Sequence, residues 1–213
     1  NVNIMNNVVI DGNTEIENNV TIFPYASIGL IPQDLKFKGE NSRLYIGKNC
    51  IIREYVTINT GTEGGGMLTR VDESCLLMVG THIAHDCHVG SKVIFANNAT
   101  LAGHVSIGNE AIIGGLSAIH QFVRVGEGAI IGGMSGVTSD VIPYGSVMGN
   151  RAKLSGLNLI GLKRKKIDKV EINAMRKLYK SIFGKNGLNF KDRISNLDKE
   201  FNNFSLCKKI ISF

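Results

Sequence analysis

The hexads VDESCL-LMVGTH-IAHDCH-VGSKVI-FANNAT-LAGHVS-IGNEAI-IGGLSA-IHQFVR-VGEGAI-IGGMSG (71–136) decide the fold of this 213-residue chain. Every sixth residue from Val71 to Val137 is large and apolar, and the residue four places after each is small or β-branched. A period of six matches neither the 3.6-residue repeat of a helix nor the alternation of one long strand. It predicts short parallel strands joined by tight turns, with one aliphatic and one small side chain of each hexad pointing inward.

The same period runs through the preceding segment, at Ile4, Ile10, Ile16, Ile22 and Ile28 and then at Ile46, Ile52 and Ile58. Residues 30–45 interrupt it without shifting its phase, whereas NTGTEGGGMLTR (59–70) shifts the phase and is expected to be a glycine-rich loop. The pattern resembles hexapeptide β-helices, in which three hexads make one turn of a triangular prism and residues eighteen apart stack. Because such a solenoid must cover its ends, we expect further coils to precede Asn1.

Composition supports a narrow interior of aliphatic and small residues. Aromatic residues make up 7% of the chain, Trp is absent and there are 25 glycines. Glycines expected near the corners, where a positive φ costs glycine little, are Gly80, Gly90, Gly103, Gly108, Gly114, Gly126 and Gly132. The four cysteines form no CxxC pair, so we expect reduced thiols in a cytoplasmic protein. No apolar run is long enough to span a bilayer.

The charge divides the chain at about residue 150. Residues 1–150 carry 8 Lys/Arg and 13 Asp/Glu, and residues 151–213 carry 16 and 5. Helical spacing of apolar residues runs through 168–183 and continues in pieces near 190–201 and 206–213, separated by Gly184 and Gly187. We therefore expect a β-helix over 1–150 and a small helical domain over 151–213. Its basic surface suits nucleic acid, a membrane, an acidic protein or plain solvation.

The histidines lie entirely within the regular repeats. His85, His104 and His120 belong to hexads eighteen residues apart, so we expect them to gather near one edge of the prism, with His82 close by. Such a cluster indicates a general base with polar helpers, a metal site or incidental surface residues.

Two neighbours of this cluster favour the general base. Asp86 offers a carboxylate that would orient the His85 imidazole. Gly103 would present a backbone N–H without a side chain in the way, as an oxyanion hole requires. Cys87, in the small inward column, is better explained by packing than by metal ligation.

Five segments resemble one family. They are HIAHDCHVG (82–90), FANNATLAGHVSIG (95–108), AIIGGLSAIHQFVRVG (111–126), IPQDLKFKGE (31–40) and GNRAKLSGLNLIGLKRK (149–165). Together they resemble the UDP-N-acetylglucosamine O-acyltransferases of bacterial lipid A synthesis, over essentially the whole chain. The resemblance implies a single-stranded left-handed parallel β-helix with a helical tail, assembled as a homotrimer with sites between subunits. It also implies transfer of a 3-hydroxyacyl group from acyl carrier protein to the glucosamine 3-hydroxyl, without cofactor or metal.

The resemblance assigns roles to individual residues. His85 would be the general base, Asp86 its partner and Gly103 the donor to the oxyanion. Residues expected to hold the substrates are His82, His104, His120, Gln121, Asp34, Leu35, Lys36, Asn158 and Arg164. Gly133 would gauge acyl length, and a glycine there predicts a longer chain.

Two departures from the family pattern concern nucleotide binding. Ile160 stands where an acidic residue is usual, and Lys165 stands where a second Arg would make a bidentate contact. Residues 151–213 have a net charge of +11 (16 Lys/Arg minus 5 Asp/Glu), which would attract the acidic acyl carrier protein rather than nucleic acid. Rival interpretations are the N-acyltransferase of the same pathway, a 3-amino acceptor, and a trimeric metalloenzyme resembling the gamma-class carbonic anhydrases.

Overall fold

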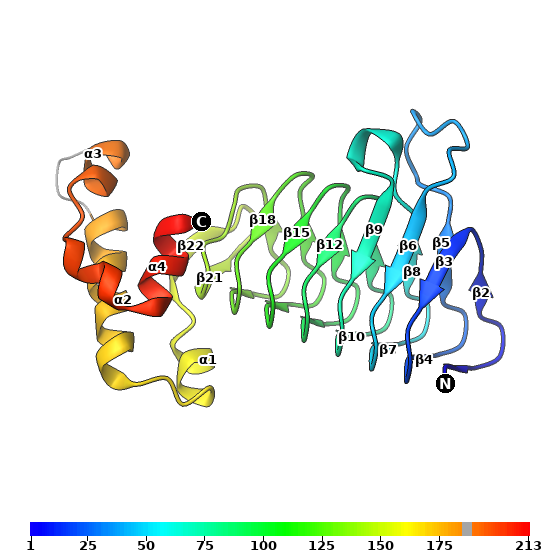
Figure 1. Cartoon of the computed structure of the whole chain (residues 1–213), viewed down its shortest axis with the longest axis horizontal. Helices are drawn as coiled ribbons and strands as arrows, with labels where there is room; N and C mark the ends of the chain where they lie inside the picture. The colour runs from blue at the N-terminus through cyan, green and yellow to red at the C-terminus, as the bar shows by residue number, and fades with distance from the viewer. Residues whose placement is uncertain (185–188) are drawn as a thin grey trace.

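The computed structural model describes residues 1–184 and 189–213, so Gly187 lies outside the described residues. The chain winds into a triangular prism whose coils stack in register, followed by helices at one end (Figure 1). This confirms the left-handed parallel β-helix with a small C-terminal helical region.

Each side of the prism is one sheet, and the strands below are those of the described residues. The first sheet contains β1 (Asn3–Ile4), β4 (Thr21–Ile22), β7 (Ile51–Ile52), β10 (Leu76–Leu77), β13 (Ile94–Phe95), β16 (Ile112–Ile113), β19 (Ile130–Ile131), β21 (Gly145–Met148) and β22 (Lys153–Leu157). The second contains β2 (Val9–Ile10), β5 (Ser27–Leu30), β8 (Thr57–Asn59), β11 (His82–Ile83), β14 (Thr100–Leu101), β17 (Ala118–Ile119) and β20 (Gly136–Val137). The third contains β3 (Asn13–Ile16), β6 (Arg43–Ile46), β9 (Leu68–Val71), β12 (His88–Val89), β15 (Ser106–Ile107) and β18 (Arg124–Val125).

The register explains the two columns of the sequence. Leu77 pairs with Phe95 and Phe95 with Ile113, an eighteen-residue step, and all three side chains are fully buried. The small column closes the interior, and Cys50, Cys75 and Cys87 lie in it as free, buried thiols. Each buried aliphatic side chain contributes about 1.5–3 kcal/mol relative to exposure, so the repeat itself supplies the core.

The predicted reason for the corner glycines is wrong in most cases. Of that set only Gly80 has a positive φ, and the left-handed turn position is filled mainly by other residues, including Asn98 and His104. Glycine is required instead because the next coil comes too close. A Cβ at Gly90 would lie 2.9 Å from the Asn109 backbone nitrogen, and one at Gly114 would lie 2.5 Å from that of Gly133.

Both interruptions of the period leave the prism at the same edge. Residues 31–42 connect β5 of the second sheet to β6 of the third, and residues 60–67 connect β8 to β9. The second loop carries one 3-10 turn, η1 (Glu63–Gly65), and both loops project together at the top of Figure 1. We call the edge between the second and third sheets the histidine edge, because the turns after β11 and β14 carry His85 and His104 there.

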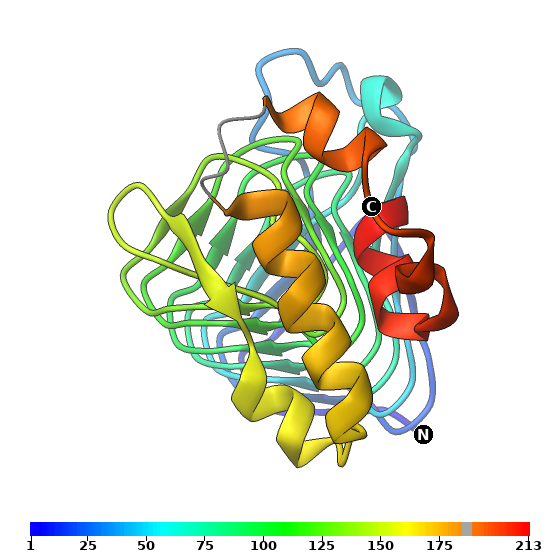
Figure 2. The same cartoon turned by 90° about the vertical axis from the view of Figure 1, so that its left-hand side faces the viewer.

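The C-terminal residues cover one end of the prism (Figure 2). The boundary expected near 150 falls in the turn between β21 and the antiparallel β22. Then follow α1 (Leu159–Arg164), α2 (Lys169–Phe183), α3 (Phe190–Ser195), η2 (Lys199–Asn203) and α4 (Ser205–Ser212). They enclose a second core around Met175, Leu178 and Cys207, with Tyr144 joining it from the prism. Within the described ranges, none of these helices has the length and apolar character needed to cross a membrane.

Candidate active site

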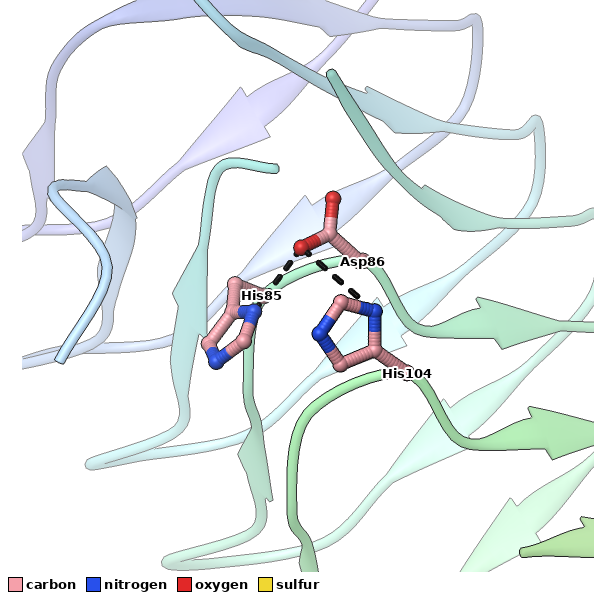
Figure 3. Close-up of side chains that lie close together, drawn as sticks. All are labelled: His85, Asp86 and His104. Carbon is pink, nitrogen blue, oxygen red and sulfur yellow. Dashed lines mark hydrogen bonds and ion pairs between the residues drawn. The ribbon is translucent and has the colours of Figure 1, made fainter. Parts of the chain in front are cut away.

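His85 and Asp86 form a pair in the turn after β11 (Figure 3). Asp86 has φ 59°, in the left-handed region, and this turns its side chain back toward its neighbour. Its Oδ2 lies 2.8 Å from His85 Nδ1, and the His85 residue is 6% exposed. A bond at Nδ1 sets the plane of the imidazole and directs Nε2 away from the carboxylate, as a general base requires.

The glycine-rich loop holds the Asp86 carboxylate. Thr62 donates its backbone N–H to Oδ1 at 2.8 Å and its hydroxyl to Oδ2 at 2.6 Å. Asp86 in turn donates its N–H to Thr69 Oγ1 at 2.8 Å, and its side chain is fully buried. A buried carboxylate is costly unless hydrogen bonds replace its water, and the loop supplies those hydrogen bonds. Gly65 packs against the carboxylate where a Cβ would overlap it.

His104 completes the cluster. Its Nδ1 lies 3.8 Å from Asp86 Oδ2, and its ring is edge-on to that of His85, with centroids 5.0 Å apart. His120 lies at the same edge, in the turn after β17, but it is exposed, and its Nδ1 lies 3.2 Å from the Gln121 carbonyl oxygen. The reason is register, since His120 follows β17 directly and therefore stacks in line with Ala102, not with His85.

Gly103 lies directly against the base. A Cβ at Gly103 would be 2.5 Å from His85 Cε1 and 2.6 Å from Nε2, so the imidazole rests on the bare glycine backbone. Gly103 is itself buried. Within the described part of the chain, its backbone N–H donates to no protein acceptor. A free donor beside Nε2 is the geometry needed to stabilise an oxyanion.

His82 is half-buried on β11, and its Nδ1 lies 2.7 Å from the Thr57 hydroxyl. Burial lowers the pKa of His82, and the positive charge of a protonated His85 lowers it further. His82 is therefore neutral near pH 7, so it takes part in hydrogen bonds rather than in charge attraction.

Asp34, Leu35 and Lys36 lie on the 31–42 loop at the histidine edge. Asp34 Oδ1 accepts the Lys36 N–H at 3.0 Å, and Leu35 and Lys36 are exposed. Glu40 of this loop accepts the Glu63 N–H at 3.1 Å, which links it to the loop that holds Asp86.

Asn158 and Arg164 lie away from the histidine edge. Asn158 caps α1 through the Gly161 N–H and donates its amide to the Gly128 carbonyl at 3.0 Å. Arg164 is exposed, whereas the adjacent Lys165 forms an ion pair with Glu110. Glu110 lies in a turn between the third and first sheets, so α1 sits at a different edge from His85.

Gly133 lies at the edge between the first and second sheets and is exposed. A Cβ there would meet the Gly115 carbonyl oxygen at 3.3 Å, a tight but adjustable contact. The surface around Gly133 is therefore free of its own side chain. Ile160 is exposed, and nothing in the described part of the structure explains its departure from the family pattern.

Thr62, Thr69 and Gly65 were missed by the sequence analysis. The shift of phase at residues 59–70 was the available signal. Ile58 pairs with Ile83, so a loop leaving after Asn59 must emerge one coil below His85. This register, together with the polar residues of the loop, would have predicted that the loop contacts the Asp86 carboxylate.

The cluster fits an oriented base better than a metal centre. One ligand atom from each of His85, Asp86 and His104 lies within 4.8 Å of the others, which is close enough for a shared ion. Both Asp86 oxygens, however, already accept hydrogen bonds from Thr62, and Oδ2 faces His85 Nδ1. An ion would have to displace these donors, whereas the observed bonds leave His85 Nε2 uncommitted.

Known proteins resemble this chain over all or part of its length. The family model described as Udp N-acetylglucosamine O-acyltransferase, Domain 2, matches residues 140–213. An acyl-[acyl-carrier-protein]–UDP-N-acetylglucosamine O-acyltransferase of Rickettsia canadensis is 52% identical over 213 residues, which is 100% of this chain and 80% of the relative. One of Paracoccus denitrificans is 47% identical over 155 residues, 73% of this chain and 59% of the relative. The crystal structure of a UDP-N-acetylglucosamine acyltransferase from Bacteroides fragilis superposes with a TM-score of 0.94 at 39% identity, covering 100% of this chain and 83% of that one.

Proposed function

This chain belongs to the UDP-N-acetylglucosamine O-acyltransferase family, and we propose that it transfers a 3-hydroxyacyl chain from acyl carrier protein to the glucosamine 3-hydroxyl of UDP-N-acetylglucosamine, the first step of lipid A synthesis. The observation that carries the proposal is the buried His85–Asp86 pair lying against Gly103. A thioester is already activated, so one base and one oxyanion donor are sufficient for acyl transfer.

In the proposed reaction each of these three residues has one role. His85 Nε2 removes the proton of the acceptor hydroxyl, and the oxygen attacks the thioester carbonyl carbon. The Gly103 N–H stabilises the negative charge on the former carbonyl oxygen. As the intermediate collapses, the C–S bond breaks and the leaving thiolate takes the proton from His85. Asp86 holds the ring and stabilises its positive charge throughout.

A transfer assay with UDP-N-acetylglucosamine and a series of hydroxyacyl carrier proteins tests this function. We expect turnover in the wild type and a loss of about 10²–10⁴-fold in His85→Ala. Retained turnover in that variant would refute the assigned base. A 3-amino analogue of the sugar distinguishes the hydroxyl from the amino acceptor. Metal analysis of the purified active protein separates this reaction from that of a metalloenzyme.

A homotrimer would bring the two parts of the site together. His85 and the 31–42 loop lie at one edge of the prism, whereas Asn158 and Arg164 lie at another. We infer that Arg164 of a neighbouring copy reaches the histidine edge, where its guanidinium would bind the diphosphate.

The outer face of the first sheet supports this assembly. Five consecutive outward positions between Thr21 and Ser146 form an aliphatic row in register, consisting of Ile51, Leu76, Ile94, Ile112 and Ile130. The equivalent row of the third sheet is polar and includes Arg70, His88 and Arg124. Ile51 and Ile94 are exposed and the other three are half-buried, and an apolar row of this kind on one outer face suits a contact between copies. Sedimentation should give the mass of a trimer, and Ile112→Asp should give a monomer.

The basic helices offer a docking surface for acyl carrier protein in the cytoplasm. A groove beside α2 is lined by Arg176, Lys177 and Lys180 together with the apolar Val170 and Phe201. Positive charge of this kind steers an acidic partner, and salt screens the attraction. We expect the KM for the acyl carrier protein to rise with ionic strength. A KM independent of salt would contradict the steering.

Gly133 would set the acyl length by leaving room beside the prism. Gly133→Met should shorten the preferred chain, because its side chain would extend into the space that glycine leaves open. The measurement is kcat/KM across carrier proteins loaded with chains of increasing length. Unchanged selectivity would remove Gly133 from this role.

A further inference from the structure

Phe122 lies at an exposed turn position, where core packing does not explain a large aromatic ring. Its φ is 66°, in the left-handed region that disfavours bulky side chains, and the residue is 65% exposed. It lies in the turn after β17, eighteen residues beyond His104, and His104 lies eighteen beyond Asp86. All three have a positive φ, so their side chains leave the histidine edge in one row. The same φ recurs at this turn position elsewhere in the prism, at Leu116 and Met134 among others, so the conformation belongs to the fold and it is the neighbour of Phe122 that distinguishes it.

The partner of Phe122 is the His104 ring. The two rings are stacked, with centroids 4.5 Å apart and planes inclined by 8°. His104 in turn lies edge-on to His85, at 89°, with its Nδ1 3.8 Å from Asp86 Oδ2. The His104 side chain is 19% exposed, and it directs its Nδ1 toward a carboxylate beyond ordinary hydrogen-bond distance.

We propose that Phe122 is a positioning residue of the reacting site: its ring fixes the plane of the His104 imidazole, so that His104 as well as His85 presents its Nδ1 to the Asp86 carboxylate. The stack fixes the plane of the His104 ring, and within that plane the charge of the nearby Asp86 carboxylate favours the flip whose Nδ1 faces it, at 3.8 Å. His104 then directs its other nitrogen, Nε2, away from the carboxylate, available to a substrate group beside His85. The kinetic part of this inference rests on the proposed function, whereas the orientation of His104 does not.

A pair on another edge provides a matched control. Tyr25 and Tyr55 also have a positive φ, 64° and 59°, and their rings are stacked with centroids 5.2 Å apart. They are 50% and 59% exposed, and they lie between the first and second sheets, away from His85. Leucine is compatible with this turn position, since Leu116 adopts it with φ 56°. Phe122→Leu and Tyr55→Leu therefore remove equivalent rings without a new backbone conflict.

The test combines histidine NMR with kinetics on the full chain. With ¹³C,¹⁵N-labelled histidine, the His104 signals are assigned by their loss in His104→Gln. In Phe122→Leu we expect those signals to lose the ring-current shift of the stacked phenyl group and the ¹⁵N pattern to change from one tautomer to a mixture. Phe122→Tyr should keep both the ring-current shift and the single-tautomer ¹⁵N pattern of the wild type. The kcat of Phe122→Leu should fall about threefold to tenfold, the size of one aromatic pair, with the KM for the nucleotide sugar unchanged. Tyr55→Leu should leave the His104 signals and kcat unchanged.

Unmoved His104 signals in Phe122→Leu would overturn the proposal, whatever happens to activity. So would an equal loss of kcat in Tyr55→Leu. A change in sedimenting mass with unchanged His104 signals would show instead that Phe122 serves the contact between copies. Absence of transfer in the wild type would count against the proposed function alone, because the NMR result still decides the orientation of His104.

Discussion

Gly103→Ala is the sharpest perturbation that this site allows. Gly103 has no positive φ, so alanine is compatible with its backbone and adds only a methyl group. That methyl carbon would lie 2.5 Å from His85 Cε1 and 2.6 Å from Nε2. Ordinary carbon contacts are about 3.5–4.0 Å, so the imidazole must move by about 1 Å. It cannot pivot freely, because Asp86 holds Nδ1 at 2.8 Å.

The expected loss follows from that displacement. A catalytic group misplaced by about 1 Å costs about 10²-fold in rate, which corresponds to about 2.7 kcal/mol of transition-state stabilisation. We therefore expect kcat for acyl transfer to fall about 10²-fold, while the overpacked methyl group lowers the free energy of unfolding by about 1–3 kcal/mol. In a His85→Ala background the same substitution should have no further effect, since the group that it displaces is gone.

Gly64→Ala is the matched control, because a Cβ there meets nothing within 4 Å. Gly64 lies in the exposed η1 turn and should tolerate the methyl group without loss of activity. A Gly103→Ala enzyme that retains kcat within about threefold of the wild type would refute the argument, because it would mean that the position of His85 does not limit the reaction.

Three further predictions concern groups around this site. Thr62→Val removes the hydroxyl that donates to Asp86 Oδ2 at 2.6 Å and should lower the free energy of unfolding in urea by about 1.5–3 kcal/mol; an unchanged midpoint would contradict it. Burial lowers the pKa of His82 in the folded chain, so as pH falls the unfolded chain takes up this proton first. The free energy of unfolding should therefore decrease from about pH 6.5 downward, until the pH passes below the folded pKa. His82→Gln should reduce the difference between the free energies of unfolding measured in urea at pH 7.5 and at pH 5. The partly exposed ion pair between Lys165 and Glu110 fixes the end of α1 to the prism, so Lys165→Met and Glu110→Gln should each raise the KM for the nucleotide sugar about twofold to fivefold. The double variant should have the same KM as either single variant, and additive effects would show that the two residues act separately.

The repeat could be predicted closely because its cause is local. Each hexad must bury one aliphatic and one small side chain, as Leu77 and Thr81 do, and the chain repeats that requirement often enough to be seen without a structure. The helical tail was recognisable for a similar reason, since α2 buries Ile172, Met175 and Leu178 at helical spacing. The basis for the corner glycines could not be read in this way, because the close approach at Gly114 comes from Gly133 in the next coil.

The surroundings of the histidines likewise depend on contacts between coils that the repeat alone does not predict. Counting in eighteens places His85 and His104 in neighbouring coils, but a difference of a single residue decides which turn position each side chain takes. His104 follows Gly103 and therefore stacks in line with Asp86, whereas His120 stacks in line with Ala102 and stays exposed. The stack of Phe122 on His104 depends on two left-handed turns that no residue preference predicts.

The sequence by itself determined the β-helix, the helical tail and the neighbourhood of His85, because these depend on periodic burial and on residues close together in the chain. Only the tertiary structure decided what surrounds the base. Thr62 reaches Asp86 across 24 residues, Gly103 lies under the ring from the next coil, and Glu110 anchors α1 at another edge. Such contacts depend on the register between coils and on where each loop leaves the prism, and these are settled by packing in three dimensions rather than by any local pattern.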